Sequence, residues 1–350
     1  MALKIKTSPS ADSVLAAEQI LNVIRKGTAM NSYRIISDFG CNLPEHLVDQ
    51  YQIGIIPTYL HTEGENSVLS SEIEISEFYQ KLREKKMIRT SAINLQSFKN
   101  YFESILENGD DVIYVGMSSG LSGTFGAAQL AAQELLEDFP ERKIFCVDTH
   151  SGCGGEGLIV YLAALKREEG ADVEENYSYL CGMSKRLQSW FTVDDLFFLK
   201  RGGRLSSATA VVGSMLMIKP LLTADEEGKL FAWGKVRGKK GVTDALLERI
   251  NALAYDPENS IFFISHADCM EDAVNFDMKL RAKWDVKDTI ITDISPAFGA
   301  HCGPNAISVF FIGKEPEQKA ALRCRVWICI LPGAPILAFS VPSILRGPRR

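Results

Sequence analysis

The sequence lacks the paired cysteines that a structural zinc site requires. Its eight cysteines are scattered over 350 residues, and none of them forms a C-x-x-C pair. In a chain of this size, scattered cysteines are typical of reduced, mostly buried thiols. We therefore expect no metal site, and we expect the protein to be cytoplasmic.

An excess of positive charge is also missing. The formal net charge is −6, which argues against an extended nucleic-acid surface. Residues 1–29 have no continuous apolar run of the kind found in signal peptides. The apolar stretch at 326–345 is long enough to cross a membrane, but Pro332, Pro335 and Pro342 would break a helix there. We expect no nucleic-acid binding and, at most, transient membrane contact.

Phosphate-binding loops are absent as well. The chain has no G-x-x-x-x-G-K-[ST] motif, and no G-x-G-x-x-G follows its first predicted strand. These absences exclude a P-loop, and we expect the protein to use no cofactor.

What the sequence does contain is an ordinary globular balance, with 46% hydrophobic and 23% charged residues. Such a chain can bury a sizeable core and still enclose an apolar cavity. Up to about residue 157, short apolar strands alternate with helical patterns, which predicts a parallel sheet covered by helices on both faces. The predicted strands are 33–37, 53–60, 111–117 and 143–147, and the predicted helices are 45–51, 76–84, 95–107 and 125–136.

After Gly157 the pattern changes to shorter strands with charged loops, which predicts a second α/β domain with a mixed sheet. Two helical patterns run to about residue 187. The later predicted strands are 189–193, 230–236, 261–265, 289–294 and 306–312, with helices at 208–215, 242–254 and 270–283. The expected organisation is an N-terminal extension at 1–30 with a helical pattern at 14–24, domains at 31–157 and 158–315, and an atypical tail at 316–350.

The strongest local feature is the loop S-S-G-L-S-G-T at 118–124, between a buried strand and a helix. Ligands of open parallel sheets bind beyond the carboxyl ends of the strands, and a helix N-terminus offers unpaired N–H groups. The pattern favours an anion site, although a helix cap with a tight turn is an alternative. Because the loop has hydroxyls and no lysine, a single carboxylate suits it better than a triphosphate.

Other candidate residues are weaker. Thr90 and Ser91 form a hydroxyl pair for which a turn or cap role is the default interpretation. His301, in the sequence G-A-H-C-G-P, is expected in a rigid turn, where it would donate to an anion or be satisfied by turn backbone. His266 is expected to be structural, and Lys219 to be held in an ion pair or at a ligand.

The basic, glycine-rich stretch 199–206 is either a solvated turn or a docking site for an anionic group or a protein partner. Near it, Phe197, Phe198 and the apolar run 215–218 are expected to line a cavity or to pack in the core.

Several of these blocks, in the same order, resemble the DegV family of fatty-acid-binding proteins. The resemblance runs from about residue 33 to residue 312. It rests on FTVDDLFFLKRGGRLSS at 191–207, IKPLLTADEEGKL at 218–230, KVRGKK at 235–240, SSGLSGTFGAA at 118–128 and GAHCGP at 299–304.

The resemblance implies a Rossmann-like parallel domain joined to a mixed-sheet α/β domain, with an acyl chain in a tunnel between them. It implies that Thr90 and Ser122 hydrogen-bond the carboxylate with His301 nearby. It also implies that Arg201 and especially Arg204 face a dihydroxyacetone-kinase-like fatty acid kinase. That partner would carry ATP and phosphorylate the carboxylate, so this chain would supply no catalytic group. The full set expected to bind the carboxylate is Thr90, Ser91, Ser122, Gly123, Thr124 and His301.

The chain departs from the family pattern at Phe39-Gly40-Cys41, at Ala92-Ile93 and at residues 125–127, which leaves ligand shape and chain length open. The family pattern ends before residues 318–350, and one hypothesis for that segment is an altered reading frame. The alternative function is a serine-dependent hydrolase or acyltransferase that uses Ser122 or Ser119. Against it, no G-x-S-x-G motif occurs and no acid–histidine pair is indicated beside either serine.

Overall fold

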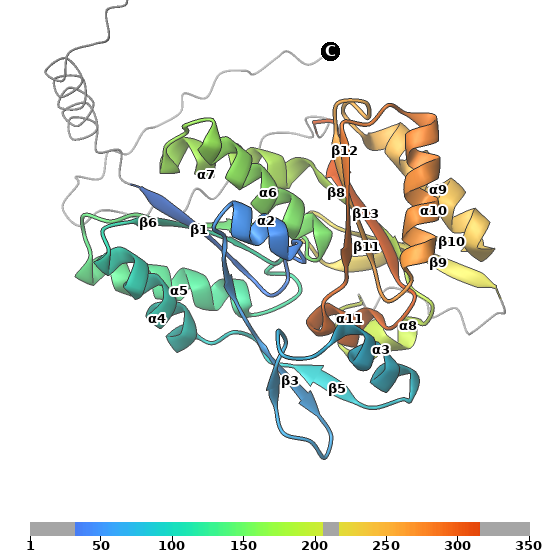
Figure 1. Ribbon diagram of the computed structural model, residues 1–350, viewed down its shortest axis with the longest axis horizontal. Coiled ribbons are helices and arrows are strands. Elements are labelled where there is room, and N and C mark those ends of the chain that lie inside the picture. Colours follow the sequence, from blue (N-terminus) through green and yellow to red (C-terminus); the bar gives the residue numbers. More distant parts are fainter. Residues whose placement is uncertain (1–31, 206–216, 316–350) are drawn as a thin grey trace, which may run out of the picture. The chain divides into compact units, whose positions relative to one another are not determined.

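The computed structural model describes residues 32–205 and 217–315 of the chain, which are coloured in Figure 1. Three sequence-based expectations lie outside the described residues: the N-terminal extension with its helical pattern, the helix at 208–215, and the tail at 316–350. Within the described residues, no helix is both long and apolar enough to cross a bilayer.

The first sheet is parallel throughout and has the strand order β2-β1-β6-β7. Helices α4 and α5 cover one face, and α6 and α7 cover the other (Figure 1). With both faces covered, every residue of the inner strand β6 is buried, which explains its continuous apolar run. The bounds are β1 (Tyr33–Asp38), β2 (Gly54–Ile56), β6 (Asp111–Gly116), β7 (Ile144–Asp148), α4 (Leu95–Glu107), α5 (Thr124–Asp138), α6 (Gly154–Glu168) and α7 (Val173–Arg186), with the short helix α2 (Glu45–Gln50) after β1.

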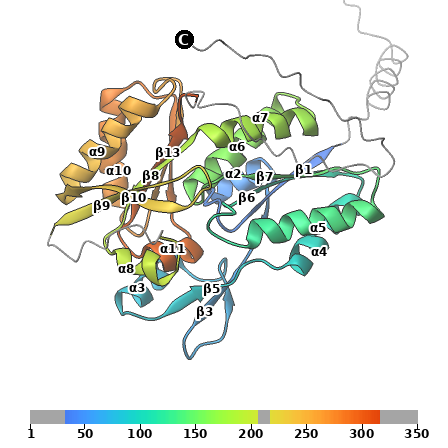
Figure 2. The same cartoon turned by 180° about the vertical axis from the view of Figure 1, so that it is seen from behind.

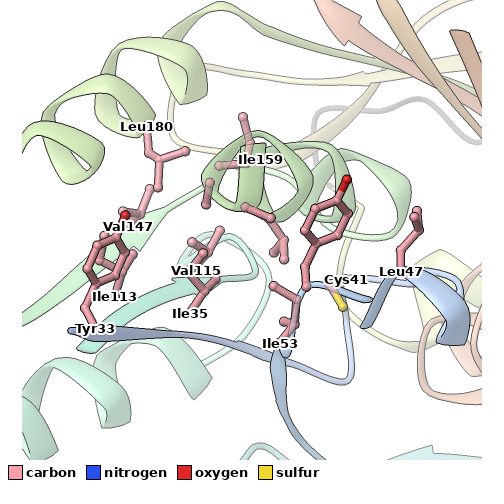
Figure 3. Packing of buried hydrophobic residues seen from close by; sticks show 14 of the residues in the cluster. Tyr33, Ile35, Cys41, Leu47, Ile53, Ile113, Val115, Val147, Ile159 and Leu180 are labelled. Carbon is pink, nitrogen blue, oxygen red and sulfur yellow. The ribbon is translucent and has the colours of Figure 1, made fainter. Parts of the chain in front are cut away.

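A hydrophobic core lies between the parallel sheet and helices α6 and α7. Branched side chains of the sheet, including Ile35, Ile113 and Val147, pack against Ile159 of α6 and Leu180 of α7 (Figure 3). All five are essentially inaccessible to solvent. Burying each such side chain contributes about 1.5–3 kcal/mol, so this core stabilises the packing of α6 and α7 on the sheet.

The second large sheet is mixed, as the sequence predicts, with the order β10-β9-β8-β13-β11-β12. Only the β11–β12 pair is parallel. Helices α9 and α10 cover one face of this sheet (Figure 2). The bounds are β8 (Leu187–Thr192), β9 (Ile218–Ala224), β10 (Leu230–Arg237), β11 (Ile261–His266), β12 (Asp288–Asp293), β13 (Ile307–Ile312), α9 (Gly238–Leu253) and α10 (Met270–Lys283), with α8 (Leu196–Arg201) after β8.

The prediction of one strand at 53–60 is wrong. The segment forms two strands, and Pro57 lies between them. Proline has no N–H and a fixed φ, so it ends the pairing of β2 in the parallel sheet. The chain then enters a separate antiparallel sheet, β4-β3-β5, which packs with α3 and α11. Its elements are β3 (Tyr59–Thr62), β4 (Val68–Leu69), β5 (Ile88–Thr90), α3 (Ile75–Arg83) and α11 (Pro296–Cys302).

Helix α6 lies between the two large sheets and contacts strands of both. Glycines at its start permit this close approach. A Cβ at Gly157 would lie 2.3 Å from the carbonyl oxygen of Cys41, and one at Gly154 would lie 2.5 Å from Ser265 Oγ. The predicted domain boundary at 157/158 falls inside this helix, and the division itself stays a prediction.

Candidate functional site

An apolar cavity lies beyond the carboxyl ends of the parallel strands, on the side of the mixed sheet that faces α6. Its empty volume is about 930 Å³, including open solvent at its mouth. The cavity lies at the position where α/β sheets bind ligands. Its main apolar lining residues are Phe39, Met117, Leu121, Phe191, Phe298 and Phe310.

One wall of the cavity carries a hydroxyl–imidazole pair. Thr90 is the last residue of β5, and its Oγ1 lies 2.9 Å from Nε2 of His301. Both residues line the cavity. The predicted turn around His301 is wrong, because this residue lies in the last turn of α11. Pro296 begins that helix, and Gly303, at a φ of +73°, ends it.

His301 is uncharged at neutral pH. Burial of the ring, reinforced by the positive charges of Arg204 and Arg201, lowers the pKa of His301 to about 4. Its Nδ1 is buried without a hydrogen-bond partner among the described residues, and a Cβ at Gly202 would lie 2.4 Å from it. The imidazole is therefore a neutral ring held tightly against Thr90.

The 118–124 loop brings Ser122 to the same cavity. Ser122 Oγ lies 2.9 Å from Thr124 Oγ1 and accepts a hydrogen bond from the Thr124 N–H at 3.2 Å. Thr124 is fully buried and also accepts from the Ile93 N–H at 3.3 Å. Thr124 and Gly123 are thus not among the cavity-lining residues, and Thr124 positions Ser122 instead.

Ser91 reaches the cavity in company with a histidine that the sequence did not single out. His61 of β3 bridges two hydroxyls, with Nε2 2.5 Å from Ser91 Oγ and Nδ1 2.7 Å from Ser67 Oγ. The antiparallel pairing of β3 with β5 places His61 opposite Arg89, close to Ser91. Because His61 and Ser91 meet only through the pairing of β3 with β5, no local sequence motif indicates their contact.

Among the described residues, neither Ser91 nor Ser122 has the partners of a hydrolase triad. Ser122 hydrogen-bonds Thr124 in place of a histidine. Ser91 does contact His61, but the group on the other side of that ring is the hydroxyl of Ser67, and no carboxylate holds it among the described contacts. A serine nucleophile needs a base that a third group orients, and a serine hydroxyl is a weak group for that role.

A guanidinium also lines the cavity. Arg204 is half-buried, its Nε donates to the Leu121 carbonyl at 3.1 Å, and burial lowers its pKa. Arg201 is not a lining residue; it donates to the Ala300 carbonyl at 3.3 Å and lies over the ring of Phe198 at 5.2 Å. The docking role predicted for both arginines stays a prediction, but Arg204 is positioned to contact a ligand as well.

The structure supports some of the other expectations about this region and contradicts others. Phe197 and Met217 are both 57% exposed and do not line the cavity, so neither a lining nor a core role holds for them. Met215 and Leu216 lie outside the described residues. Of the two alternatives for Lys219, an ion pair or a ligand contact, the structure has the ion pair, with Nζ 2.7 Å from Asp194. His266 is buried beside Asp293, as a structural residue would be.

Two buried carboxyl groups lie beneath the cavity. A Cβ at Gly40 would meet Glu156 Oε2 at 2.6 Å, Asp38 Oδ1 at 2.8 Å and the Phe298 ring at 2.9 Å. Asp38 accepts hydrogen bonds from Tyr114 at 2.6 Å and from two backbone N–H groups. Burial and the charge of Asp38 raise the pKa of Glu156 well above its ordinary value.

The hydrogen bonds indicate which carboxyl group carries the proton. Ser37 has one hydroxyl proton, and its Oγ lies 2.8 Å from the Val115 carbonyl and 2.9 Å from Glu156 Oε1. If Ser37 donates to the carbonyl, the second hydrogen bond needs a proton from Glu156. Burial raises the pKa of Asp38 too, but its three hydrogen-bond donors oppose that shift, so Glu156 is the more readily protonated member of the pair.

The fold and cavity define a class of protein: an α/β protein built on a parallel sheet and a mixed sheet, with an apolar ligand cavity lined by residues from both. The hydroxyl groups of Thr90, Ser91 and Ser122 are among the groups that line that cavity.

The chain belongs to the DegV family. The family model described as "uncharacterised protein, DegV family" matches residues 32–314. A DegV domain-containing protein of Clostridium perfringens is 38% identical over 292 residues, which cover 82% of this chain and 100% of that protein. The family that the sequence blocks resemble is thereby confirmed.

Solved structures agree. A DegV family protein of Thermus thermophilus, described by its fatty acid binding, has a TM-score of 0.74 at 28% identity and covers 81% of this chain and 100% of its own. DegV of Bacillus subtilis, described as a fatty acid binding protein, has a TM-score of 0.72 at 27% identity, with the same coverage.

Proposed function

We propose that this protein binds a long-chain fatty acid in the cavity and holds its carboxylate at Thr90 and Ser122. The observation that carries the proposal is the combination in one cavity of an apolar lining with a cluster of hydroxyls beside a neutral histidine. Fatty acid binding by relatives of the same fold supports the choice of ligand.

The apolar wall supplies most of the gross affinity. Each buried CH₂ contributes about 0.8 kcal/mol, so a chain of roughly sixteen carbons gains on the order of 10 kcal/mol. Immobilising the chain offsets much of this gain. The hydroxyl groups then determine which end of the molecule lies at Thr90, because a carboxylate needs donors that the phenylalanine rings do not offer.

The headgroup site offers donors without a strong ion pair. Thr90 and Ser122 each have one O–H, and a hydrogen bond to a carboxylate contributes about 1.5–3 kcal/mol. His301 is neutral, so its role is to hold the Thr90 hydroxyl. The Arg204 guanidinium, which hydrogen-bonds the Leu121 carbonyl, adds positive potential at the same wall.

We infer further that the bound acid is presented to a partner kinase, with Arg201 and Arg204 near the contact surface, and that this chain contributes no catalytic group. The half-exposed Phe197, whose ring lies 5.7 Å from the Arg201 guanidinium, gives the same surface an apolar element. A partner that brings ATP is consistent with a sequence that has no phosphate-binding loop.

Lipid extraction followed by mass spectrometry tests the ligand. Protein purified from cells should release long-chain fatty acids, and delipidated protein should take up added oleate. An empty protein that also fails to bind oleate would refute the proposal.

Two assays test the non-catalytic role. Hydroxylamine trapping should detect acyl phosphate only when a fatty acid kinase and ATP are added together with this protein. A fluorophosphonate probe should label none of Ser91, Ser119 and Ser122. Acyl phosphate formed by this chain alone, or labelling of any of these serines, would favour an enzyme.

A further inference from the structure

The cavity has a second polar region, separate from the wall around Thr90. Ser189 of β8 and Ser308 of β13 line the cavity beside Phe191 and Phe310. The strand register places Ser189 opposite Phe310, and Ser308 opposite Phe191. The four side chains therefore alternate on one face of the sheet, and the two serines are diagonal neighbours about 7–8 Å apart.

Ser151 completes this second polar region. Its Oγ lies 2.8 Å from Ser189 Oγ, and all three serines of the group are at least 91% buried. The region lies beyond the ring of Phe298, which is one helical turn before His301. A Cβ at Gly152, next to Ser151, would lie 2.3 Å from that ring. An acyl chain that begins at Thr90 and continues past Phe298 would meet these serines along its length, away from its carboxylate.

The hydroxyls of this group keep unused hydrogen-bonding capacity. Ser308 donates to the Ser265 carbonyl at 3.1 Å, which leaves its lone pairs available. The Ser151–Ser189 pair uses one proton, and the other goes either to the Gly152 carbonyl at 3.4 Å or toward the cavity. In both directions of the Ser151–Ser189 hydrogen bond, serine lone pairs stay available to the cavity, whereas a serine O–H points into the cavity in only one of them. A ligand group that donates a hydrogen bond therefore finds an acceptor in either arrangement.

We propose that this serine subsite, Ser151, Ser189 and Ser308, binds a hydroxyl group carried in the middle of the acyl chain. The ligand class would be a mid-chain hydroxy fatty acid. A plain hydrocarbon chain leaves the spare lone pairs of these buried hydroxyls unused, and a ligand O–H can donate to one of them. The inference rests on the proposed function, since it assumes that the carboxylate lies at Thr90.

The test is a competition assay on delipidated full-chain protein, with a fluorescent fatty acid as the reporter. The competitors are stearate and hydroxystearates with the hydroxyl next to the carboxylate, at mid-chain, or at the methyl end. We expect the mid-chain isomer to bind roughly three- to tenfold more tightly than stearate, the gain from one net hydrogen bond. The other two isomers should show no gain.

Variants separate the subsite from general effects. Ser189→Ala and Ser308→Ala should each reduce the preference for the mid-chain isomer while stearate binds at least as well as before. Ser184→Ala is the matched control, because Ser184 is buried in α7 away from the cavity lining. Stearate binding more tightly than the mid-chain isomer, or a preference that persists in both subsite variants, would overturn the inference. Failure of every acid to bind would instead refute the proposed function.

Discussion

Thr90 Oγ1 and His301 Nε2 lie 2.9 Å apart, although 211 positions separate the two residues in the sequence. The contact joins the end of β5 in the small sheet to the last turn of α11, next to the cavity. Because His301 is neutral, it orients the threonine hydroxyl without adding a charge. The carboxylate site proposed here depends on this pair and on Ser122.

Removing one hydroxyl should weaken fatty acid binding. In the Thr90→Val and Ser122→Ala proteins, one charge-assisted hydrogen bond of about 1.5–3 kcal/mol is lost, so we expect roughly a 10- to 100-fold rise in the Kd for oleate. Fluorescence competition measures the change. Ser104→Ala is the control, because Ser104 is an exposed residue of α4 that bonds only its own helix. Unchanged affinity in both variants would place the carboxylate elsewhere.

A methyl group at Gly202 should displace His301. The added Cβ would lie 2.4 Å from His301 Nδ1, closer than atoms approach without moving. We expect Gly202→Ala to weaken oleate binding, because the ring can no longer hold Thr90 in place.

Gly126→Ala provides the matched control for that substitution. Its Cβ would project into open space within α5, so it should leave binding unchanged and stabilise the fold by up to about 1 kcal/mol. Calorimetry and the same binding assay compare the two. Equal binding by both proteins would show that the position of His301 does not matter.

The buried histidine should make stability fall in acid. The pKa of His301 is about 4 in the folded protein and about 6.5 when unfolded, so the unfolded chain binds more protons between these values. The free energy of unfolding should therefore fall as the pH drops from 6.5 toward 4, by at most about 3 kcal/mol from this group.

Urea unfolding over this pH range, with His301→Gln as the comparison, measures that contribution. In the His301→Gln protein, the free energy of unfolding should change less steeply with pH. Nitrogen chemical shifts of the ring should also show that the pKa of His301 rises when oleate binds, because a nearby carboxylate favours the imidazolium form. A ring that is protonated at neutral pH without ligand would contradict the proposed electrostatics.

The buried acid should act in the opposite direction. The pKa of Glu156 is raised in the folded protein, so the folded state keeps a proton that the unfolded state releases. Stability should fall as the pH rises above the ordinary glutamate range. Glu156→Gln keeps the shape without the titration, and its unfolding free energy should depend less on pH than that of the unaltered protein.

Much of the fold follows from local patterns. Helices at 95–107 and 270–283 match their predictions, because their apolar spacing is complete and their ends carry clear signals such as the Asn94 cap. The parallel sheet follows from continuous apolar strands. Pro57 was the signal that could have split the strand predicted at 53–60.

The site was less accessible from the sequence. The hydroxyl loop at 118–124 was visible because all of its parts are adjacent in the chain. The pairing of His61 with Ser91 depends on the register of β3 against β5, and the burial of His301 depends on packing against α8. The serine subsite needs the β8–β13 register. Such relationships arise only when distant segments pair.

A crystal structure of the protein with oleate would test the proposed carboxylate site. We expect tubular density in the cavity, with the carboxylate within hydrogen-bond distance of Thr90 Oγ1 and Ser122 Oγ. A carboxylate far from both hydroxyls, or a cavity closed by side chains with no room for the acyl chain, would contradict it.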